Sequence, residues 1–292
     1  MRPSRLHAGH VFLIPWFVGF FGLTLGPALA SLYLSFTNYD LLQAPGWVGL
    51  SNYIRILTAD AKVAESVRVT LLYVVLSVPF KLGFALAVAM LLNQGMRGLP
   101  LYRALFYLPS LLGASVAIAT LWRQVFSGDG LLNRVLALFG IQGASWVSDP
   151  DTAIYTLVAL SVWQFGSPMI IFLAGLRQLP RDIYEAAALD GATAWSQFRH
   201  ITIPLLTPVI FFNLVVQTID AFKAFTPAFI ISGGTGGPIN ATLFYTLYLY
   251  QEAFGYLRMG YAAALAWLLV LAIGAITAAA FLTARRWVHY EA

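Results

Sequence analysis

The most constraining feature of this chain is a series of long apolar runs with almost no charge. A helix needs about 20 residues to cross the hydrocarbon core of a bilayer, which is about 30 Å thick. Six runs are near that length or longer, and they cover residues 11–36, 69–92, 104–122, 152–176, 201–231 and 259–284. Because they lack the polar–apolar alternation of barrel strands, they predict six transmembrane helices in one all-α membrane domain over residues 1–292.

The composition agrees with a membrane protein and excludes several other classes. Of the 292 residues, 60% are hydrophobic and 10% are charged, whereas a soluble domain carries about 25% charged residues. There is no cysteine, and the four histidines lack a zinc-binding spacing, so we expect no disulfide and no metal site. The net charge of +5 is expected to reflect loop orientation and not a nucleic-acid partner. The first run is longer than the apolar core of a signal peptide, about 7–15 residues, and predicts a retained helix.

The charges between the runs predict which connections face the cytoplasm. The N-terminus, the second–third loop, the fourth–fifth loop and the C-terminus together carry nine bases and four acids, whereas the other connections carry six bases and seven acids. Cytoplasmic loops are enriched in Lys and Arg. Both termini and the fourth–fifth loop are therefore expected to lie in the cytoplasm.

The fourth–fifth loop, residues 181–208, contains a regular and alanine-rich stretch, EAAALDGATAWSQFRHITIPLLTP at 185–208. Asp182 is well placed to cap a short helix, the pair Asp190-Gly191 predicts a sharp turn, and a second short helix over 194–199 leads to the fifth span. An isolated helix this short is marginal in water. It must therefore pack either against its own bundle or, through its alanine face, in a groove of a soluble partner.

These residues also carry a resemblance to a known family. The matching positions are Glu185, Ala186, Ala187, Asp190, Gly191, Ala192, Phe198, Ile201, Pro204 and Pro208. At this spacing they resemble the EAA loop of permease subunits of binding-protein-dependent ABC importers. Residues 225–242 and 260–264 are similar to the carbohydrate-uptake branch, and in particular to the first permease of maltose- and glycerol-phosphate-type systems. The extra N-terminal spans and the large periplasmic insertion of the maltose-type subunit have no counterpart in this sequence.

The resemblance implies the type I ABC importer permease fold: six transmembrane helices, cytoplasmic termini, and a cytoplasmic coupling helix between helices 4 and 5. It implies that Glu185, Ala186, Ala187, Asp190, Gly191 and Ala192 couple the chain to an ATPase, with Glu185 as a polar anchor and Gly191 as the turn. The implied partners are a second permease subunit, a dimeric cytoplasmic ATPase that binds ATP and Mg, and an extracytoplasmic sugar-binding protein. The implied location is the inner membrane of a bacterial or archaeal cell. The chain has no phosphate-binding loop of its own, so we expect no catalytic residue, no cofactor and no enzyme activity in it.

Polar residues inside the predicted spans are candidates for substrate contact, because a charge there is costly unless it is paired or hydrated. Asn213, Gln217 and Asp220 fall on one stripe of the fifth span, and such a stripe suits a hydroxyl-rich ligand such as a sugar. Trp163, Gln164 and Ser167 share a face of the fourth span at a similar depth. The alternative is that these two sets hold helices together or form core packing.

Other interpretations of the intramembrane charges remain open. Asp220 and Lys223 are three residues apart and could pair with each other, which would also suit a proton-coupled secondary transporter. An intramembrane enzyme and a structural scaffold are further alternatives, but the sequence shows no nucleophile motif. A glycerol-phosphate or polyol cargo is also compatible with the pattern. Lys81 and Lys223 could be structural residues or ligand contacts, and an anionic cargo would favour their role as ligand contacts.

Overall fold

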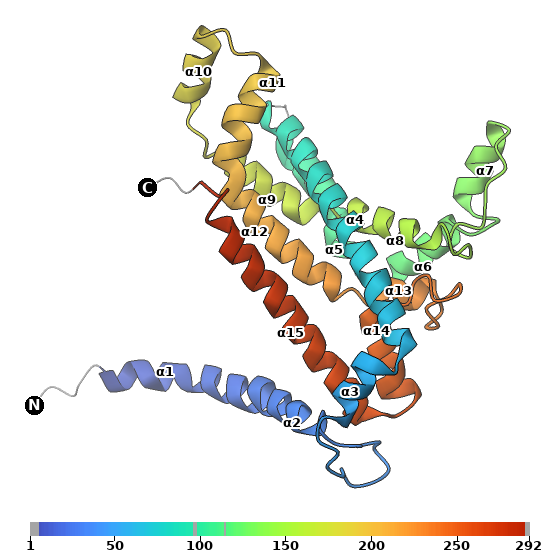
Figure 1. Ribbon diagram of the computed structural model, residues 1–292. Coiled ribbons are helices and arrows are strands. Elements are labelled where there is room, and N and C mark those ends of the chain that lie inside the picture. Colours follow the sequence, from blue (N-terminus) through green and yellow to red (C-terminus); the bar gives the residue numbers. More distant parts are fainter. Residues whose placement is uncertain (1–5, 96–97, 114, 290–292) are drawn as a thin grey trace, which may run out of the picture. The chain divides into compact units, whose positions relative to one another are not determined.

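The computed structural model describes residues 6–95, 98–113 and 115–289 as a helical protein with two compact units (Figure 1). The first unit draws on residues 1–61 and 249–272, and the second on residues 62–248 and 273–292. In the described residues, four helices are long and apolar enough to cross a membrane, or up to six if each of two bent helix pairs is one span. Several residues that entered the count of loop charges lie outside the described part of the chain, namely Arg2, Arg5, Arg97 and Glu291.

Unit 1 combines the N-terminal helices with the segment that leads into the last helix. Its elements are α1 (Leu6–Val18), the π-helical turn η1 (Gly19–Leu25), α2 (Gly26–Leu34), α3 (Ser51–Thr58), the π-helical turn η3 (Gln251–Gly255) and the first half of α15 (Met259–Ala284). One candidate span of 23 residues, Phe12–Leu34, runs through α1, η1 and α2. The first predicted apolar run is therefore helical over most of its length.

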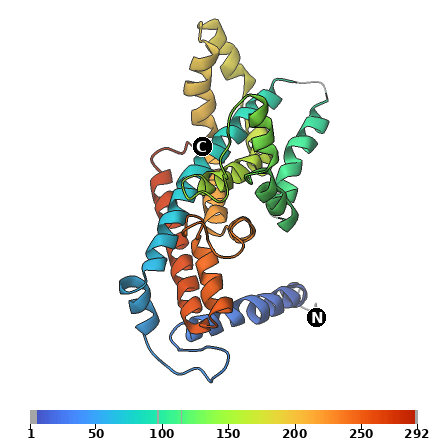
Figure 2. The same cartoon turned by 90° about the vertical axis from the view of Figure 1, so that its right-hand side faces the viewer.

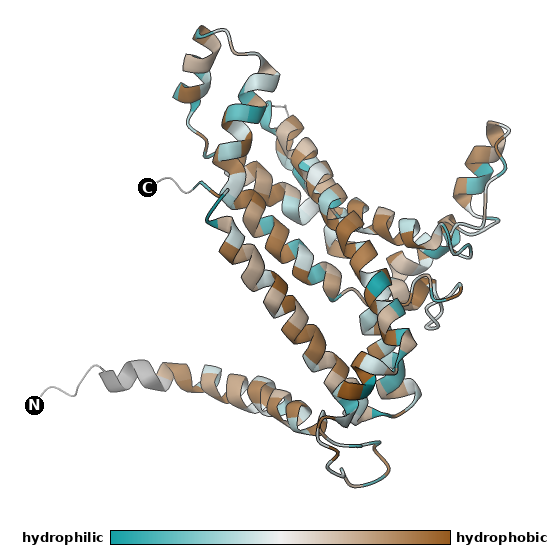
Figure 3. Cartoon of the chain, in the orientation of Figure 1, coloured by the Kyte–Doolittle hydropathy of each residue, from teal (hydrophilic) through white to brown (hydrophobic). Residues whose placement is uncertain are grey.

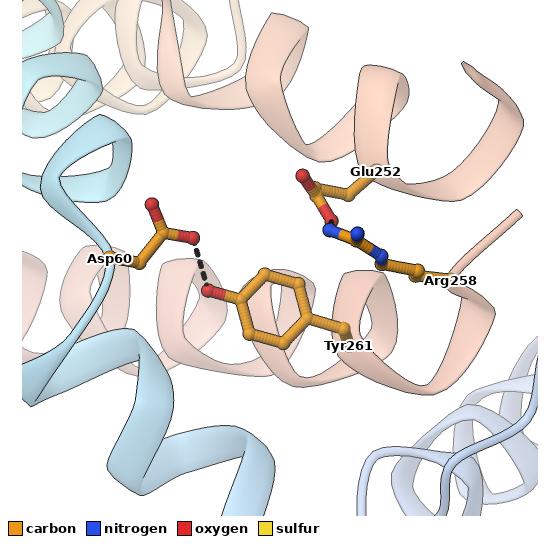
Figure 4. Close-up of polar contacts among 4 residues, drawn as sticks. All are labelled: Asp60, Glu252, Arg258 and Tyr261. Atoms are coloured by element: carbon orange, nitrogen blue, oxygen red, sulfur yellow. Dashed lines mark hydrogen bonds and ion pairs between the residues drawn. The ribbon is translucent and has the colours of Figure 1, made fainter. Parts of the chain in front are cut away.

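Polar side chains hold the connections of unit 1 together (Figure 4). The Tyr261 hydroxyl, at the start of α15, donates a hydrogen bond of 2.6 Å to the Asp60 carboxylate. Arg258 forms an ion pair with the buried carboxylate of Glu252 at 3.2 Å. The Arg55 guanidinium of α3 lies 4.7 Å from the centre of the Tyr261 ring, a distance that allows a cation–π contact. These contacts link α3 to the segment that joins η3 and α15.

Unit 2 contains the remaining helices and most of the buried core. They are α4 (Ala61–Asn93), α5 (Leu99–Leu112), α6 (Val116–Val125), α7 (Leu131–Leu138), α8 (Ala153–Trp163), α9 (Gly166–Leu176), α10 (Arg181–Leu189), α11 (Ala194–Gln197), the π-helical turn η2 (Phe198–Thr202), α12 (Ile203–Phe222), α13 (Thr226–Ile231), the start of α14 (Tyr245–Tyr250) and the second half of α15. Helix α9 packs against both α5 and α12, and α13 packs against α6. Figure 3 shows apolar residues along most of α15, as expected for a charge-free run that faces lipid.

The third predicted run, 104–122, is not one straight helix. It falls on α5 and α6, which are bent by 95°. The break follows Gly113, the C-cap of α5, and α6 then begins with a cap of its own: the Ser115 hydroxyl accepts a hydrogen bond from the backbone N–H of Ile118. A glycine that weakens the helix and a serine that caps a new one together explain the break.

The fourth predicted run, 152–176, is also divided, into α8 and α9 with a bend of 44°. Pro168 lies in the first turn of α9, where its missing N–H costs least, but it leaves the carbonyl of Gln164 without its helical donor. The Ser110 hydroxyl of α5 donates to that carbonyl at 2.9 Å and accepts from the backbone N–H of Ser167 at 3.0 Å. A side chain from another helix thus completes the hydrogen bonding of the bend.

The C-terminal segment after α15 is attached to α12. Pro208 removes the helical donor for the carbonyl of Pro204, and the Thr207 hydroxyl donates to this carbonyl at 2.6 Å. The same hydroxyl accepts a hydrogen bond of 3.0 Å from the backbone N–H of His289. Val288 joins Phe211 in a small hydrophobic cluster. One threonine therefore compensates for a proline in α12 and fixes the following C-terminal residues to it.

Candidate substrate cavity and coupling loop

A cavity of about 380 Å³ lies among the helices of unit 2, within the size range of ligand pockets in proteins, about 300–1,000 Å³. It is lined by α4, α5, the α8–α9 bend, the C-terminal end of α12 and the residues that follow it. The polar lining residues are Tyr73, Ser77, Lys81, Ser110, Ser161, Gln164, Ser167, Gln217, Asp220, Lys223 and Thr226. Hydroxyl, amide and charged groups are thus brought together inside predicted membrane spans.

Four of the six residues predicted to contact substrate meet in this cavity. Gln217 and Asp220 come from α12, and Gln164 and Ser167 come from the bend between α8 and α9. The amide of Gln164 donates a hydrogen bond of 3.0 Å to the backbone carbonyl of Gly113, which fixes its orientation. The two predicted sets, identified on separate spans, therefore line one space.

The other two residues are placed differently. Asn213 is fully buried in the core and is absent from the cavity lining, and neither polar atom of its side chain has a hydrogen-bond partner in the described part of the chain. Trp163 is also absent from the lining, and its ring packs against Trp122 with centroids 5.9 Å apart. The prediction that Trp163 shares a helical face with Ser167 is wrong, because α8 ends at Trp163 and α9 begins at Gly166.

Sequence reasoning named Lys81 as a possible ligand contact but missed two other polar residues of α4 that line the cavity, Tyr73 and Ser77. Tyr73, Ser77 and Lys81 follow one another at intervals of four residues and all three line the cavity. Residues spaced by four lie on one face of a helix, so a search for polar neighbours of Lys81 would have found the other two. Ser110 was missed as well, because its place depends on the packing of α5 against α9.

The three charged groups in the cavity are Lys81, Asp220 and Lys223. Neither lysine forms an ion pair within 4.0 Å with the Asp220 carboxylate. The predicted pairing of Asp220 with Lys223 is not observed: in the described residues the ion pairs within 4.0 Å are Glu65–Arg68 and Glu252–Arg258.

A second candidate site is the loop between α9 and α12, which forms one end of unit 2 (Figures 1 and 2). Helix α10 ends at the predicted turn, where Gly191 has a positive φ of 81°. The backbone N–H groups of Gly191 and Ala192 donate to the carbonyls of Ala188 and Ala187, respectively. These two bonds form a Schellman motif, which favours glycine at the left-handed position.

Two details of the loop differ from the sequence-based expectation. Asp182 does not cap α10: the N-cap is Pro180, without a side-chain cap, and Asp182 lies in the first turn, where a carboxylate interacts favourably with the helix dipole. The second short helix does not stop at residue 199. It begins with the cap of Thr193, whose hydroxyl accepts from the N–H of Ser196, and continues through η2 into α12.

Much of the loop surface is exposed, including large apolar side chains. The exposed fraction is 91% for Leu189, 68% for Trp195 and 41% for Ile183. Within the loop, the hydroxyls of Tyr184 in α10 and Thr202 in η2 are joined by a hydrogen bond of 2.9 Å. Large apolar side chains that are exposed on one loop are a feature of surfaces that bind another protein.

Residues 62–288 match the family model described as "binding-protein-dependent transport system inner membrane component". The chain belongs to this family of ABC transporter permeases, a class that agrees with the helical architecture and with the EAA-like loop. The chain is also 52% identical over 292 residues to the probable ABC transporter permease protein YesP of Bacillus subtilis (strain 168), covering 100% of this chain and 94% of YesP.

Further relatives are named for their cargo. The lactose transport system permease protein LacF of Rhizobium radiobacter is 33% identical, with 95% of this chain and 94% of LacF covered. The sn-glycerol-3-phosphate transport system permease protein UgpA of Agrobacterium fabrum (strain C58 / ATCC 33970) is 34% identical, with 90% of each chain covered.

Solved structures show the fold. A chain of a bacterial alginate ABC transporter, in complex with a periplasmic protein that holds an alginate pentasaccharide, is similar with a TM-score of 0.83. The sequence identity is 19%, and the match covers 97% of this chain and 96% of the other. At this identity the similarity supports the ABC permease fold and carries no statement about cargo.

Proposed function

We propose that this chain is the membrane-spanning permease subunit of an ATP-driven importer that carries a sugar, a di- or oligosaccharide. It works in the inner membrane of a bacterial or archaeal cell. Its partners are a second permease subunit, a dimeric cytoplasmic ATPase that binds ATP and Mg, and an extracytoplasmic sugar-binding protein. Family membership supports the role as a permease, and the relative named for lactose transport supports the cargo class.

The observation that carries this proposal is the polar cavity. Its lining offers five hydroxyl groups from serine and threonine, one from tyrosine and two side-chain amides, and these groups can replace the water contacts of a sugar's hydroxyls. A ligand that must leave again is served by many weak polar contacts rather than by one tight pocket. The Gln217–Asp220 part of the predicted stripe and the Gln164–Ser167 part of the bend would contact the sugar together.

The mechanism that fits this arrangement is alternating access. The binding protein delivers the sugar on the outer side, closure of the ATPase dimer opens the cavity outward, and ATP hydrolysis resets the bundle inward. No covalent chemistry takes place in this chain. Its own residues bind the sugar and transmit the movement of the partner.

The α10–α11 loop is the element that would meet the ATPase. Its exposed Leu189 and Trp195 favour docking on a partner over packing against its own bundle. Glu185 is exposed on the same helix and would act as the polar anchor. A proton-coupled secondary transporter would need no such surface, so the loop also argues against that alternative.

Reconstituted complexes test the proposal. Glu185→Ala is expected to reduce both sugar uptake and the ATP hydrolysis stimulated by loaded binding protein, while the complex still assembles. The matched control is Asp182→Ala, which removes an exposed carboxylate from the first turn of the same helix and should leave both activities close to wild type. If the two variants behave alike, the loop does not couple through Glu185. If no sugar stimulates hydrolysis in the wild type, a polyol or glycerol-phosphate cargo replaces the sugar.

A further inference from the structure

Helix α3 is held in a fixed orientation beside the C-terminal end of α2. The Asn52 side chain donates hydrogen bonds of 2.9 Å to the backbone carbonyls of Ser35 and Thr37. The hydroxyls of Tyr53 and Ser35 share a hydrogen bond of 2.7 Å, and Ile56 on the same side of α3 is buried. These contacts define the packed face of α3 and therefore also the faces that point away from the protein.

A second face of α3 is apolar and exposed. Leu50, Ile54 and Leu57 follow one another at spacings of four and three residues, so they lie on one side of the helix. Their exposed fractions are 60%, 59% and 75%, respectively. The third face is polar, and its exposed residues are Ser51, Arg55 and Thr58. The exposed part of α3 is thus amphipathic, with an apolar side that no described part of the chain covers.

Aromatic rings lie at the end of α2, next to this helix. The centre of the Trp47 ring is 5.8 Å from that of Tyr33 and 5.5 Å from that of Phe36. Tyr33 belongs to the last turn of the candidate span Phe12–Leu34, and 64% of Trp47 is exposed. Tryptophan and tyrosine are enriched where a span meets the lipid headgroups. The aromatic cluster therefore indicates that α2 ends at a membrane–water interface.

The connection between two spans keeps α3 close to that interface. The chain leaves one candidate span at Leu34 and enters the next at Ala61. The hydrogen bonds from α3 go to Ser35 and Thr37, which directly follow the first of these spans. The start of α3 consequently lies at the depth at which the span ends.

We propose that Trp47 and the Leu50–Ile54–Leu57 face of α3 form a lipid anchor that lies in the membrane interface. Amphipathic helices of this kind bury their apolar face about 5–10 Å into the boundary between headgroups and acyl chains. Continuity with the end of a span favours lipid over a protein as the occupant of this face. The anchor concerns the membrane and not the cargo, so it stands apart from the proposed function.

Site-directed labelling in the complete importer tests the anchor. The chain has no cysteine, so single cysteines can be introduced in a complex whose other subunits also lack cysteine. The test variants are Ile54→Cys and Leu57→Cys, and the matched controls are Ser51→Cys and Thr58→Cys on the polar face of the same helix. All four side chains are exposed, so a small replacement leaves the packing of α3 intact. Each variant receives a polarity-sensitive fluorophore in vesicles of phosphatidylethanolamine and phosphatidylglycerol.

We expect the labels at positions 54 and 57 to emit at shorter wavelength than those at positions 51 and 58. A nitroxide-bearing lipid should quench them at least about twofold more than the controls, and aqueous iodide at least about twofold less, because they lie among acyl chains. If a labelled variant does not assemble, the unmodified importer gives a second measurement. A lipid with a photoactivated group near its headgroup should then form adducts within residues 47–57, which mass spectrometry locates.

Other outcomes overturn the inference. Strong quenching by iodide and weak quenching by lipid at all four positions shows that α3 lies in water. Protection of positions 54 and 57 from both quenchers assigns the face to a protein. That protein is the binding protein if its removal abolishes the protection, and another subunit if it does not. The absence of lipid adducts on residues 47–57 also contradicts the anchor. Sugar uptake by the same complex is measured separately, so a failure of the anchor leaves the proposed function standing.

Discussion

The close approach of α5 and α9 at Gly166 leaves no room for a single added methyl group. A Cβ atom at this position would lie 2.5 Å from the carbonyl oxygen of Phe106 and 2.7 Å from the Cα atom of Tyr107. Both obstacles are backbone atoms, so no side-chain rotation can relieve them. Because Cβ contacts essentially never fall below 3.0 Å, Gly166→Ala must separate the two helices by at least about 0.5 Å at this point.

The separation also reaches the hydrogen bonds of the bend. The bonds from Ser110 to Gln164 and from Ser167 to Ser110, now 2.9 and 3.0 Å long, would stretch to the limit of hydrogen-bond geometry. Overpacking costs about 1–3 kcal/mol, and each weakened hydrogen bond costs about 0.5–1.5 kcal/mol. We therefore expect Gly166→Ala to lower the free energy of unfolding by about 2–6 kcal/mol.

Thermal unfolding of the purified complex measures this effect. The expected fall in the unfolding midpoint is about 4–24 °C, at about 2–4 °C per kcal/mol. Sugar uptake should fall with it, because Gln164 and Ser167, which line the cavity, lie at the bend. The control is Gly274→Ala in α15, where no atom lies within 4 Å of the added Cβ and alanine favours the helix by about 1 kcal/mol. If both variants unfold at the wild-type temperature, the helices are not in the close contact described above.

Three further predictions concern the loop, the C-terminal segment and unit 1. Gly191→Val forces a branched residue to the positive φ of 81° and should reduce stimulated ATP hydrolysis. The control is Gly140→Val, at a φ of 73° in another connection, which should leave coupling intact. Equal losses in the two variants would refute a special role for the α10 turn. Thr207→Val removes the hydroxyl that binds the C-terminal segment and should lower the free energy of unfolding by about 1–3 kcal/mol, with faster proteolysis of that segment. Thr207→Ser keeps the hydroxyl and should resemble the wild type in both measurements. Tyr261→Phe deprives the Asp60 carboxylate of a hydrogen bond of 2.6 Å. A hydrogen bond to a charged group contributes about 1.5–3 kcal/mol, so its loss should lower the unfolding midpoint by several degrees. An unchanged midpoint would show that the bond contributes nothing to stability.

Sequence patterns predicted helices well where one local signal decided the outcome. The run 259–284 became α15 with the same bounds, because Arg258 and Arg285 delimit an uninterrupted apolar stretch. The bend between α8 and α9 was not predicted, since it depends on the Ser110 hydroxyl, which is 54 residues from Gln164 in the chain. Breaks that rest on such distant contacts leave little signal in the run itself.

In the cavity, too, local helical spacing was predictive and long-range packing was not. Helical spacing placed Asn213, Gln217 and Asp220 on one stripe, and the structure brings the last two into the cavity. Helical spacing shows which residues share a face of a helix, but it does not show which part of that face neighbouring helices cover. Asn213 lies on the covered part and is therefore buried in the core. Whether these residues contact the cargo stays a prediction.

The continuity of α11, η2 and α12 has a mechanical consequence. Residues 194–222 form an unbroken helical rod, about 44 Å long at about 1.5 Å per residue. One end bears the exposed loop and the other bears Gln217 and Asp220. A tilt of about 5° at the loop end would displace the opposite end by about 4 Å. The rod acts as a lever arm, and the π-helical turn η2 lies near its loop end, as is frequent for π-helical turns at functional sites.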